Sequence, residues 1–300
     1  MGMCLHDSLM THAQPFHLWI LCTDTPVEQQ LKRLSLPNVT IIPLEEIEND
    51  ELLKAKQDRT IAEYCWTLTP FTFQAVFDRD KNVDRVTYVD ADLFFFSDPR
   101  TLINELDTEK KDVLITEHAY APDYEYWLPQ SGRFCVQFLT VGNNEKGRRV
   151  MTWWQNRCVE WCYARFEDGK FGDQKYLDQW PLLFPEIVHI LTQRDKTLAP
   201  WNIFHVSKNK RGNIDPVFFH FHGLKIASPD SLWLCSNYRI GKQGLRLYQQ
   251  YKTMLQKNIA IMRRNDFAVR YRPVQISIKS SIRRFLERKP GFSKLNLNCD

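Results

Sequence analysis

The chain has 300 residues, of which 43% are hydrophobic and 25% charged, the usual mix of a folded globular protein. This composition excludes a disordered, collagen-like or coiled-coil protein, and no apolar run approaches the roughly 20 residues of a membrane-spanning helix. The formal net charge of +4 is uneven: residues 251–300 hold twelve Lys/Arg against three Asp/Glu, a net +9, so the first 250 residues carry −5.

Short apolar runs alternate with longer mixed segments, a pattern that predicts an α/β fold. Strands are expected at 17–22, 39–44, 86–93, 113–117, 134–141, 187–191 and 217–222. Helices are expected at 27–33, 60–77, 147–165 and 244–256, and Pro70 should kink or split the second of them. The composition changes near residue 240, which predicts one domain over 1–240 and a basic helical extension over 241–300.

The sequences near the two ends of the chain predict where in the cell the protein is located. The first residues lack the basic and then apolar pattern of a signal peptide, so a cytoplasmic location is expected. Near the other end, Ile278, Ile282, Phe285 and Leu286 recur at helical spacing among basic residues. This stripe predicts a helix on the anionic inner face of the cytoplasmic membrane, the alternative being a helix packed on the body.

Two further features of the composition exclude common kinds of site. The 1–250 body has no basic patch with interleaved aromatic residues, so nucleic-acid binding is not expected. The eight cysteines form no CxxC pair and several lie in apolar segments, which predicts reduced, buried thiols.

A pair of carboxylates follows one predicted strand. Asp90 and Asp92 come directly after the apolar run 86–89, and in an extended segment their side chains point the same way. Two such carboxylates repel each other unless a cation lies between them, and Mg²⁺ or Mn²⁺ prefers oxygen ligands that it shares with phosphates. Open α/β sheets bind ligands at the carboxyl ends of their strands. The sequence therefore predicts a metal site here, the alternative being a solvated turn.

Two histidines offer a further ligand. Alternation along 217–222 puts His220 and His222 on one face of a strand and Phe219 and Phe221 on the other. A neutral imidazole nitrogen can complete the ligand shell of a metal ion. The alternative is a structural pair whose hydrogen bonds go to the backbone.

Four segments carry a resemblance to a known family. They are YVDAD at 88–92 followed by FSDP at 96–99, FGDQKYLD at 171–178, LAPWN at 198–202 and HFHGLK at 220–225. In this order they resemble nucleotide-sugar glycosyltransferases with the GT-A fold, especially the glycogenin-like group and bacterial polysaccharide and lipopolysaccharide transferases. The resemblance covers about residues 5–240 and implies a single Rossmann-like domain.

The resemblance also implies an activity. It implies a metal-dependent hexosyltransferase that moves a hexose from a UDP-sugar to a cell-surface glycan or glycolipid acceptor, as in polysaccharide or lipopolysaccharide biosynthesis. Because the likeness is to retaining enzymes, it implies retention at the anomeric carbon. A front-face substitution, in which a diphosphate oxygen takes the acceptor's proton, suits an amide beneath the sugar better than a covalent intermediate does.

The resemblance assigns roles to individual residues. The cofactor would be Mn²⁺ or Mg²⁺ on Asp90, Asp92 and His220, with His222 as the alternative third ligand. Asp173 would hold sugar hydroxyls and Gln174 would lie beneath the anomeric carbon. The donor would also contact Asp90, Trp201, Asn202 and Lys225, the last by neutralising a phosphate oxygen. An N-cap role for Asp173 and a core position for Trp201 are the structural alternatives.

The chain departs from the family pattern in two places. It opens with a segment like the helix that follows the family's first strand, so that strand is expected to be absent, and Cys135 stands where an Asn is expected. Two other functions remain open. One is a phosphatase of the HAD type, which also needs a strand ending in two aspartates, although Leu93 stands where that family has Thr or Val. The other is a non-catalytic, membrane-associated relative of the transferases.

Overall fold

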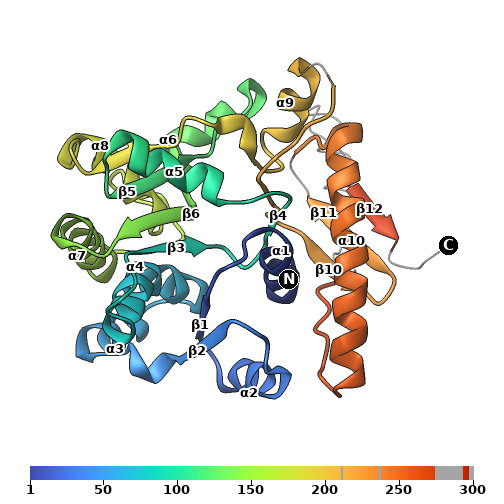
Figure 1. Ribbon diagram of the computed structural model, residues 1–300, viewed down its shortest axis with the longest axis horizontal. Helices are drawn as coiled ribbons and strands as arrows, with labels where there is room; N and C mark the ends of the chain where they lie inside the picture. Colours follow the sequence, from blue (N-terminus) through green and yellow to red (C-terminus); the bar gives the residue numbers. More distant parts are fainter. Residues whose placement is uncertain (211, 236–237, 274–292, 297–300) are drawn as a thin grey trace.

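The computed structural model describes residues 1–210, 212–235, 238–273 and 293–296 (Figure 1). The α-helices are α1 (Gly2–His12), α2 (Thr25–Leu34), α3 (Asp50–Lys56), α4 (Ile61–Arg79), α5 (Arg100–Glu109), α6 (Leu128–Ser131), α7 (Glu145–Glu160), α8 (Trp180–Leu183), α9 (Ile203–Asn209) and α10 (Gly241–Arg264). The strands are β1 (Leu18–Cys22), β2 (Val39–Pro43), β3 (Arg85–Val89), β4 (Leu93–Phe95), β5 (Val113–Glu117), β6 (Phe134–Gly142), β7 (Val188–Ile190), β8 (Thr197–Leu198), β9 (Phe218–His220), β10 (Lys225–Ser228), β11 (Ser231–Cys235) and β12 (Ser293–Asn296).

The strands form four small sheets. The largest has the order β3-β6-β5-β7, in which β6 runs antiparallel to both neighbours and β7 runs parallel to β5. A second sheet has the order β4-β9-β8, a third the order β10-β11-β12, and β1 pairs in parallel with β2. Within the described residues no strand joins β1 to β3.

Two apolar layers pack against the largest sheet, one on each face. One contains Phe73 and Phe77 of α4 and Trp154 of α7, packed on side chains of β5 and β6. The other joins α1, α5 and the strands β4 and β9 to the opposite face, around Leu106 and Phe138. The predicted α/β class is confirmed, and the mixed parallel and antiparallel arrangement is of the GT-A-like kind that the resemblance implies.

The helix predicted at 60–77 is not interrupted at Pro70. Helix α4 runs from Ile61 to Arg79 with Pro70 inside it. It begins at a capping box, in which the Thr60 side chain accepts from the backbone of Glu63 and the Glu63 carboxylate accepts from the backbone of Thr60. Residues on both sides of Pro70, among them Leu68 and Phe73, are buried, so tertiary packing holds the helix together across the missing hydrogen bond.

The helix predicted at 147–165 begins and ends earlier. Helix α7 begins after Asn144, whose side chain accepts from the backbone of Gly147, and it ends at Glu160. Beyond the helix, the backbone N–H of Ala164 donates to the carboxylate of Glu63 at 2.7 Å. This contact between residues 101 positions apart holds the chain in a non-helical path, and local sequence patterns do not reveal it.

The predicted C-terminal extension includes a long helix that packs on the body. Helix α10 is longer than the expected 244–256, and its Tyr248 and Tyr251 lie in one apolar cluster with Phe219 and Phe221. The rings of Phe221 and Tyr251 stack with centroids 3.9 Å apart. The division at residue 240 remains a prediction. The stripe at 278–289 lies outside the described residues.

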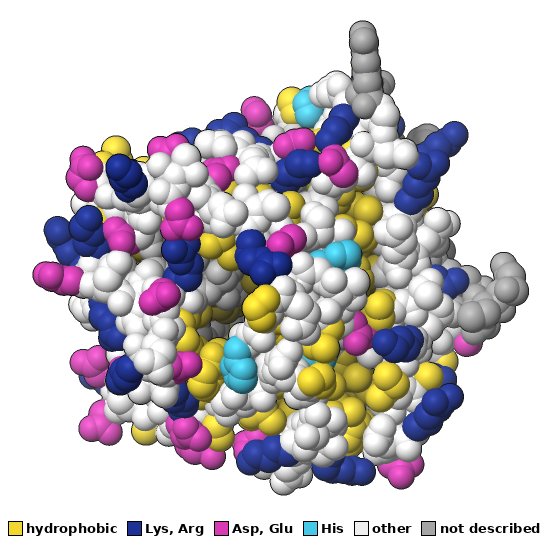
Figure 2. Space-filling model, in the orientation of Figure 1, with side chains coloured by type: hydrophobic (Ala, Val, Ile, Leu, Met, Phe, Trp, Pro, Cys, Tyr) yellow, Lys and Arg dark blue, Asp and Glu magenta, His cyan; other side chains and the backbone are white. Residues whose placement is uncertain are grey.

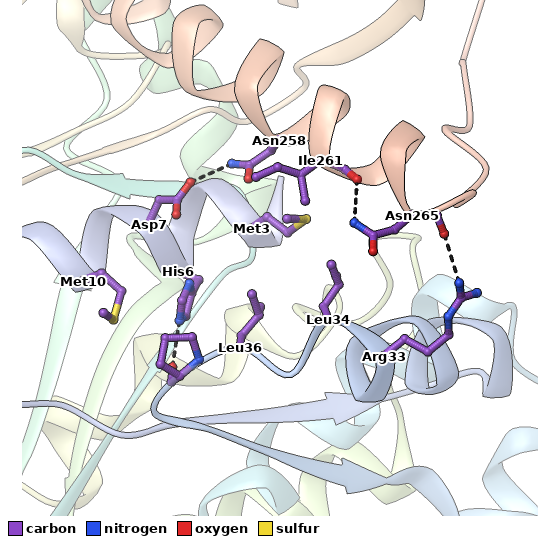
Figure 3. Close-up of a pocket in the computed structure, with 11 residues that line it drawn as sticks. Met3, His6, Asp7, Met10, Arg33, Leu34, Leu36, Asn258, Ile261 and Asn265 are labelled. Atoms are coloured by element: carbon purple, nitrogen blue, oxygen red, sulfur yellow. Dashed lines mark hydrogen bonds between the residues drawn. The ribbon is translucent and has the colours of Figure 1, made fainter.

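A groove lies between α10, α1 and the connection from α2 to β2 (Figure 3). Hydrogen bonds across this groove attach α10 to the rest of the domain. Its volume is about 410 Å³. Across it, the Asn258 amide donates to the Asp7 carboxylate at 2.9 Å, and the Arg33 guanidinium donates to the backbone carbonyl of Asn265. Side chains of Met3 and Leu34 point into the groove from opposite sides.

Two expectations about the chain as a whole can be compared with the structure. The seven cysteines that the structure describes form no disulfide with one another, and all of them except Cys65 are buried, as predicted. The helices in the described ranges include none that is long and apolar enough to cross a membrane.

Candidate active site

The two aspartates lie in a turn between strands. The strand expected at 86–93 is divided: β3 ends at Val89, β4 begins at Leu93, and the backbone N–H of Leu93 donates to the carbonyl of Asp90 at 3.0 Å. Simple strand alternation therefore does not orient the two carboxylates, and that part of the prediction is wrong. The turn nevertheless directs both carboxylates toward one imidazole.

His220 reaches the aspartates because β9 pairs antiparallel with β4, with Leu93 directly opposite His220. Its Nε2 lies 3.0 Å from Oδ1 of Asp92 and 3.7 Å from Oδ2 of Asp90. One ligand atom from each of the three residues lies within 4.8 Å of the others. Asp90, Asp92 and His220 could therefore hold a metal ion, as the sequence predicts.

The electrostatics of the cluster fit a bound cation. Burial raises the pKa of the Asp90 carboxyl, and the neighbouring Asp92 raises it further, against the opposing effect of His220. Burial also acts to raise the pKa of Asp92, but the charge and hydrogen bond of His220 outweigh it, so that pKa is lowered. Burial acts to lower the pKa of His220, and the two carboxylates raise it well above its ordinary value. The carboxylates thus draw positive charge to the point between them, where a divalent cation can take the place of a proton.

The second histidine lies nearby but outside the cluster. The rings of His220 and His222 are 5.5 Å apart, and both line the same pocket. The His222 side chain is exposed to solvent, and its pKa is lowered by partial desolvation against the pocket wall and by the neighbouring His220. As the alternation predicts, Phe219 and Phe221 lie on the opposite side, in the apolar cluster with α10.

The cluster opens into a pocket of about 450 Å³. Asp173, Gln174 and Trp201, all expected at the site, line this pocket together with the metal-ligand candidates. Further aromatic side chains line it, most of them outside the segments that carry the family resemblance. These are Trp66, Tyr88, Tyr120, Trp127, Phe171 and Tyr238.

Asp173 is buried and unlike an ordinary surface carboxylate. Burial, together with the nearby Asp90, raises its pKa to about 7. It occupies the N-cap position of the 3-10 helix Gln174–Gln179, as the structural alternative expected, but its side chain makes no capping hydrogen bond there. The Gln174 amide donates to the backbone carbonyl of Ser131 at 3.0 Å, which fixes that side chain at the edge of the pocket.

The remaining predicted donor residues are placed differently from one another. Trp201 lines the pocket and its indole N–H donates to the carbonyl of His118. Asn202 is buried and holds a turn, accepting from the backbone of Ala199 at 2.9 Å, and it does not line the pocket. Lys225 is exposed at the start of β10 and does not line the pocket either. Roles for Asn202 and Lys225 in donor binding remain predictions.

Two contacts at the cluster went unrecognised in the sequence. The Tyr88 hydroxyl donates to Oδ1 of Asp90 at 2.9 Å, and Gln137 lies 2.7 Å from Nδ1 of His220. Tyr88 could have been found, since it lies in β3 only two residues before Asp90. No local signal connects Gln137 with His220, 83 residues away.

Curated relatives place the chain in a family. No family model matches it. It is 34% identical over 241 residues to YfnD of Bacillus subtilis, an uncharacterised protein, covering 78% of this chain and 76% of YfnD. The chain belongs to the YfnD family. YfnF of the same organism, also uncharacterised, is 33% identical over 239 residues, covering 76% of this chain and 78% of YfnF.

Solved structures similar to this YfnD-family chain include glycosyltransferases. GlyE of Streptococcus pneumoniae in its apo form has a TM-score of 0.48 at 14% identity, covering 86% of this chain and 59% of GlyE. Mouse xyloside xylosyltransferase 1 has a TM-score of 0.45 at 14% identity, covering 74% of this chain and 91% of that one. Because these likenesses are distant, the function proposed below rests on the residues of the site.

Proposed function

We propose that the chain is a metal-dependent glycosyltransferase that uses a nucleotide-sugar donor. One observation carries the proposal: Asp90, Asp92 and His220 converge within coordinating reach of one another on the wall of a pocket that also presents Asp173 and Gln174. Two carboxylates and an imidazole suit Mn²⁺ or Mg²⁺, and a divalent cation when bound would neutralise a diphosphate and stabilise it as a leaving group.

Each residue around the cluster has its own role in binding the donor. Asp90 and Asp92 orient the phosphate end of the donor, and Tyr88 holds the Asp90 carboxylate in place through its 2.9 Å hydrogen bond. Asp173 accepts from sugar hydroxyls, and Gln174 lies beneath the anomeric carbon, held by Ser131. The aromatic side chains of the pocket offer faces on which sugar rings stack and exclude water from the reacting bond.

The finer parts of the proposal are a UDP-hexose donor, transfer with retention, and a cell-surface glycan or glycolipid acceptor. An amide such as that of Gln174 is a poor nucleophile but can stabilise an oxocarbenium-like centre. This chemistry supports front-face substitution, in which the departing diphosphate takes the proton of the acceptor hydroxyl. The hexose and the acceptor depend on the orientation of single hydroxyls in the pocket.

A membrane acceptor would suit the charge of the C-terminal region. Helix α10 carries Lys and Arg along its length and no acidic residue. Figure 2 shows basic side chains more frequent than acidic ones on the side of the molecule where α10 lies. We propose that this region holds the enzyme peripherally on an anionic membrane surface, where each basic residue contributes about 1 kcal/mol.

Donor hydrolysis tests the activity. Purified protein with Mn²⁺ should release sugar from one member of a panel of UDP- and GDP-sugars, and Mn²⁺ with UDP should raise the melting temperature more than either does alone. A HAD-type phosphatase would instead release phosphate from an aryl phosphate. Binding of Mn²⁺ and UDP without turnover on any donor and acceptor would favour the non-catalytic relative.

A further inference from the structure

Gln137 makes hydrogen bonds to two of the three candidate metal ligands, Asp90 and His220. It lies on β6 and only 1% of it is exposed. Its backbone carbonyl accepts from the backbone N–H of Asp90 at 3.1 Å, and its side-chain Oε1 lies 2.7 Å from Nδ1 of His220. One buried residue thus connects the turn that carries the aspartates with the strand that carries the histidine.

The contact determines which nitrogen of His220 is free for a metal ion. An amide oxygen only accepts, so the hydrogen bond to Oε1 of Gln137 requires a proton on Nδ1. In a neutral imidazole that proton leaves the lone pair on Nε2, the atom that lies 3.0 Å from Oδ1 of Asp92. Metal-binding histidines commonly use such a partner on the second nitrogen to fix tautomer and ring orientation.

Stability alone does not explain a glutamine at this position. The side-chain nitrogen of Gln137 is buried without a hydrogen-bond partner within the described part of the chain. An apolar side chain of the same length would avoid this unpaired amide. Only its oxygen makes a bond, and that bond goes to His220.

The strand is also distorted where Gln137 lies. Leu114 of β5 pairs with Thr140, whereas Thr116 pairs with Cys135, so β6 bulges against β5 over the segment that contains Gln137. The Thr116 hydroxyl bonds the carbonyls of Cys135 and Phe138 and stabilises this irregular segment. Bulges next to active sites re-aim side chains, and this one lets the Gln137 amide reach His220.

We propose that Gln137 is a positioning residue for His220: it holds the Nδ1–H tautomer and the plane of the ring, so that Nε2 faces the cation. Cys135 of the same strand also interacts with His220, through its thiol, but a thiol is a weak hydrogen-bond acceptor. The inference rests on the proposed metal-dependent function, because it assigns a role toward a cation at Asp90, Asp92 and His220.

Mn²⁺ binding to the whole protein, followed by the electron paramagnetic resonance signal of free Mn²⁺, tests this role. Gln137→Met keeps the shape but removes the acceptor, and we expect Mn²⁺ affinity to fall at least about tenfold. Gln137→Glu keeps an acceptor for Nδ1–H, so its affinity should equal or exceed that of the original protein. The matched control is Thr140→Val on the same strand as Gln137, which removes the partly buried 2.9 Å hydrogen bond to Thr87 of β3 and should leave affinity unchanged.

Each outcome decides between the role and its alternatives. Unchanged affinity in a folded Gln137→Met protein would overturn the positioning role, as would equal losses in Gln137→Met and Gln137→Glu. If Gln137→Met does not fold, nitrogen-15 spectra of the unaltered protein with Mg²⁺ provide the test: His220 must be protonated at Nδ1, and protonation at Nε2 would overturn the inference. If the unaltered protein binds neither Mn²⁺ nor Mg²⁺, the proposed metal-dependent function itself fails.

Discussion

Nε2 of His220 lies 3.0 Å from Oδ1 of Asp92, although the two residues are separated by more than 120 positions in the chain. The pairing of β4 with β9 produces this contact, because it sets Leu93 opposite His220. The carboxylates therefore lie on the turn that enters one strand, and the imidazole lies at the end of its neighbour. A site built from two paired strands is held by backbone hydrogen bonds on both sides, which favours a rigid ligand set.

Replacing Asp92 by alanine should remove the site without unfolding the domain. We expect donor hydrolysis to fall by at least about 10²–10³-fold, because the diphosphate would lose its principal electrostatic partner. Circular dichroism and melting temperature should stay close to those of the unaltered protein. The matched control is Asp98→Ala, which removes an exposed carboxylate paired with Arg100 in the same segment and should retain full activity. Undiminished hydrolysis in the Asp92 variant would contradict the proposed site.

Asp173 should make the stability of the metal-free protein depend on pH. Its pKa is raised to about 7 in the folded state, above the ordinary value of 3.8, so the stability it confers is complete below about pH 4 and is lost as pH rises toward 7. Asp173→Asn should therefore be more stable than the unaltered protein at pH 8, by at most roughly 4 kcal/mol, and equally stable at pH 4. Urea unfolding of both proteins at the two pH values measures this difference. A constant difference between them would show that Asp173 titrates normally.

Glu63 should contribute to stability through backbone contacts at both of its oxygens. The N–H of Ala164 donates to Oε1 and that of Thr60 donates to Oε2, and the bond from Ala164 is the main cause of a lowered pKa. We expect Glu63→Ala to lower the free energy of unfolding by about 1–3 kcal/mol, and Glu63→Gln to lose less because an amide oxygen can still accept. Since the pKa is lowered by folding, the contribution of Glu63 should be present near pH 7 and disappear as pH falls below about 4. Equal stability of all three proteins at pH 7 would contradict this.

Truncation before α10 and truncation after α10 should have different effects on the folding of the domain. A chain that ends at Ile240 would expose Phe219 and Phe221, because it lacks Tyr248 and Tyr251 of α10, and we expect it to be insoluble. A chain that ends at Pro273 keeps α10 but lacks β12, which pairs with β11, so we expect it to melt cooperatively at a lower temperature and to hydrolyse donor normally. It should bind vesicles that contain anionic lipid more weakly, because it keeps the basic residues of α10 but lacks those beyond residue 273. Sedimentation with vesicles measures this, and unchanged binding would refute a membrane role for the last residues.

Parts of the fold could be read from local patterns. The apolar runs predicted the strand Val113–Glu117 with both of its bounds, and the helix expected at 60–77 begins within one residue of the start of α4. Where the prediction failed, distant contacts were responsible. Packing carried α4 through Pro70, and the bond between Ala164 and Glu63 turned the chain away after α7. Local propensities of a few tenths of a kcal/mol per residue are readily outweighed by such contacts.

The residue types alone determined that this chain has an acidic pair after a strand, two histidines facing away from two phenylalanines, and an Asp-Gln segment between these two groups. The acidic pair and the histidines are enough to predict a metal site, whereas the transferase activity was implied by the resemblance of four segments to a known family. Only the tertiary structure showed that His220, the ligand that the resemblance implies, lies close to both aspartates, that Lys225 and Asn202 lie outside the pocket, and that Gln137 contacts the histidine. The physical reason is that the chemistry of a site follows from its side-chain types, which a sequence states directly. Coordination of a metal ion requires distances of a few ångströms between its ligands. These distances are set by strand register and by a bulge in β6, which bring together residues more than 80 positions apart.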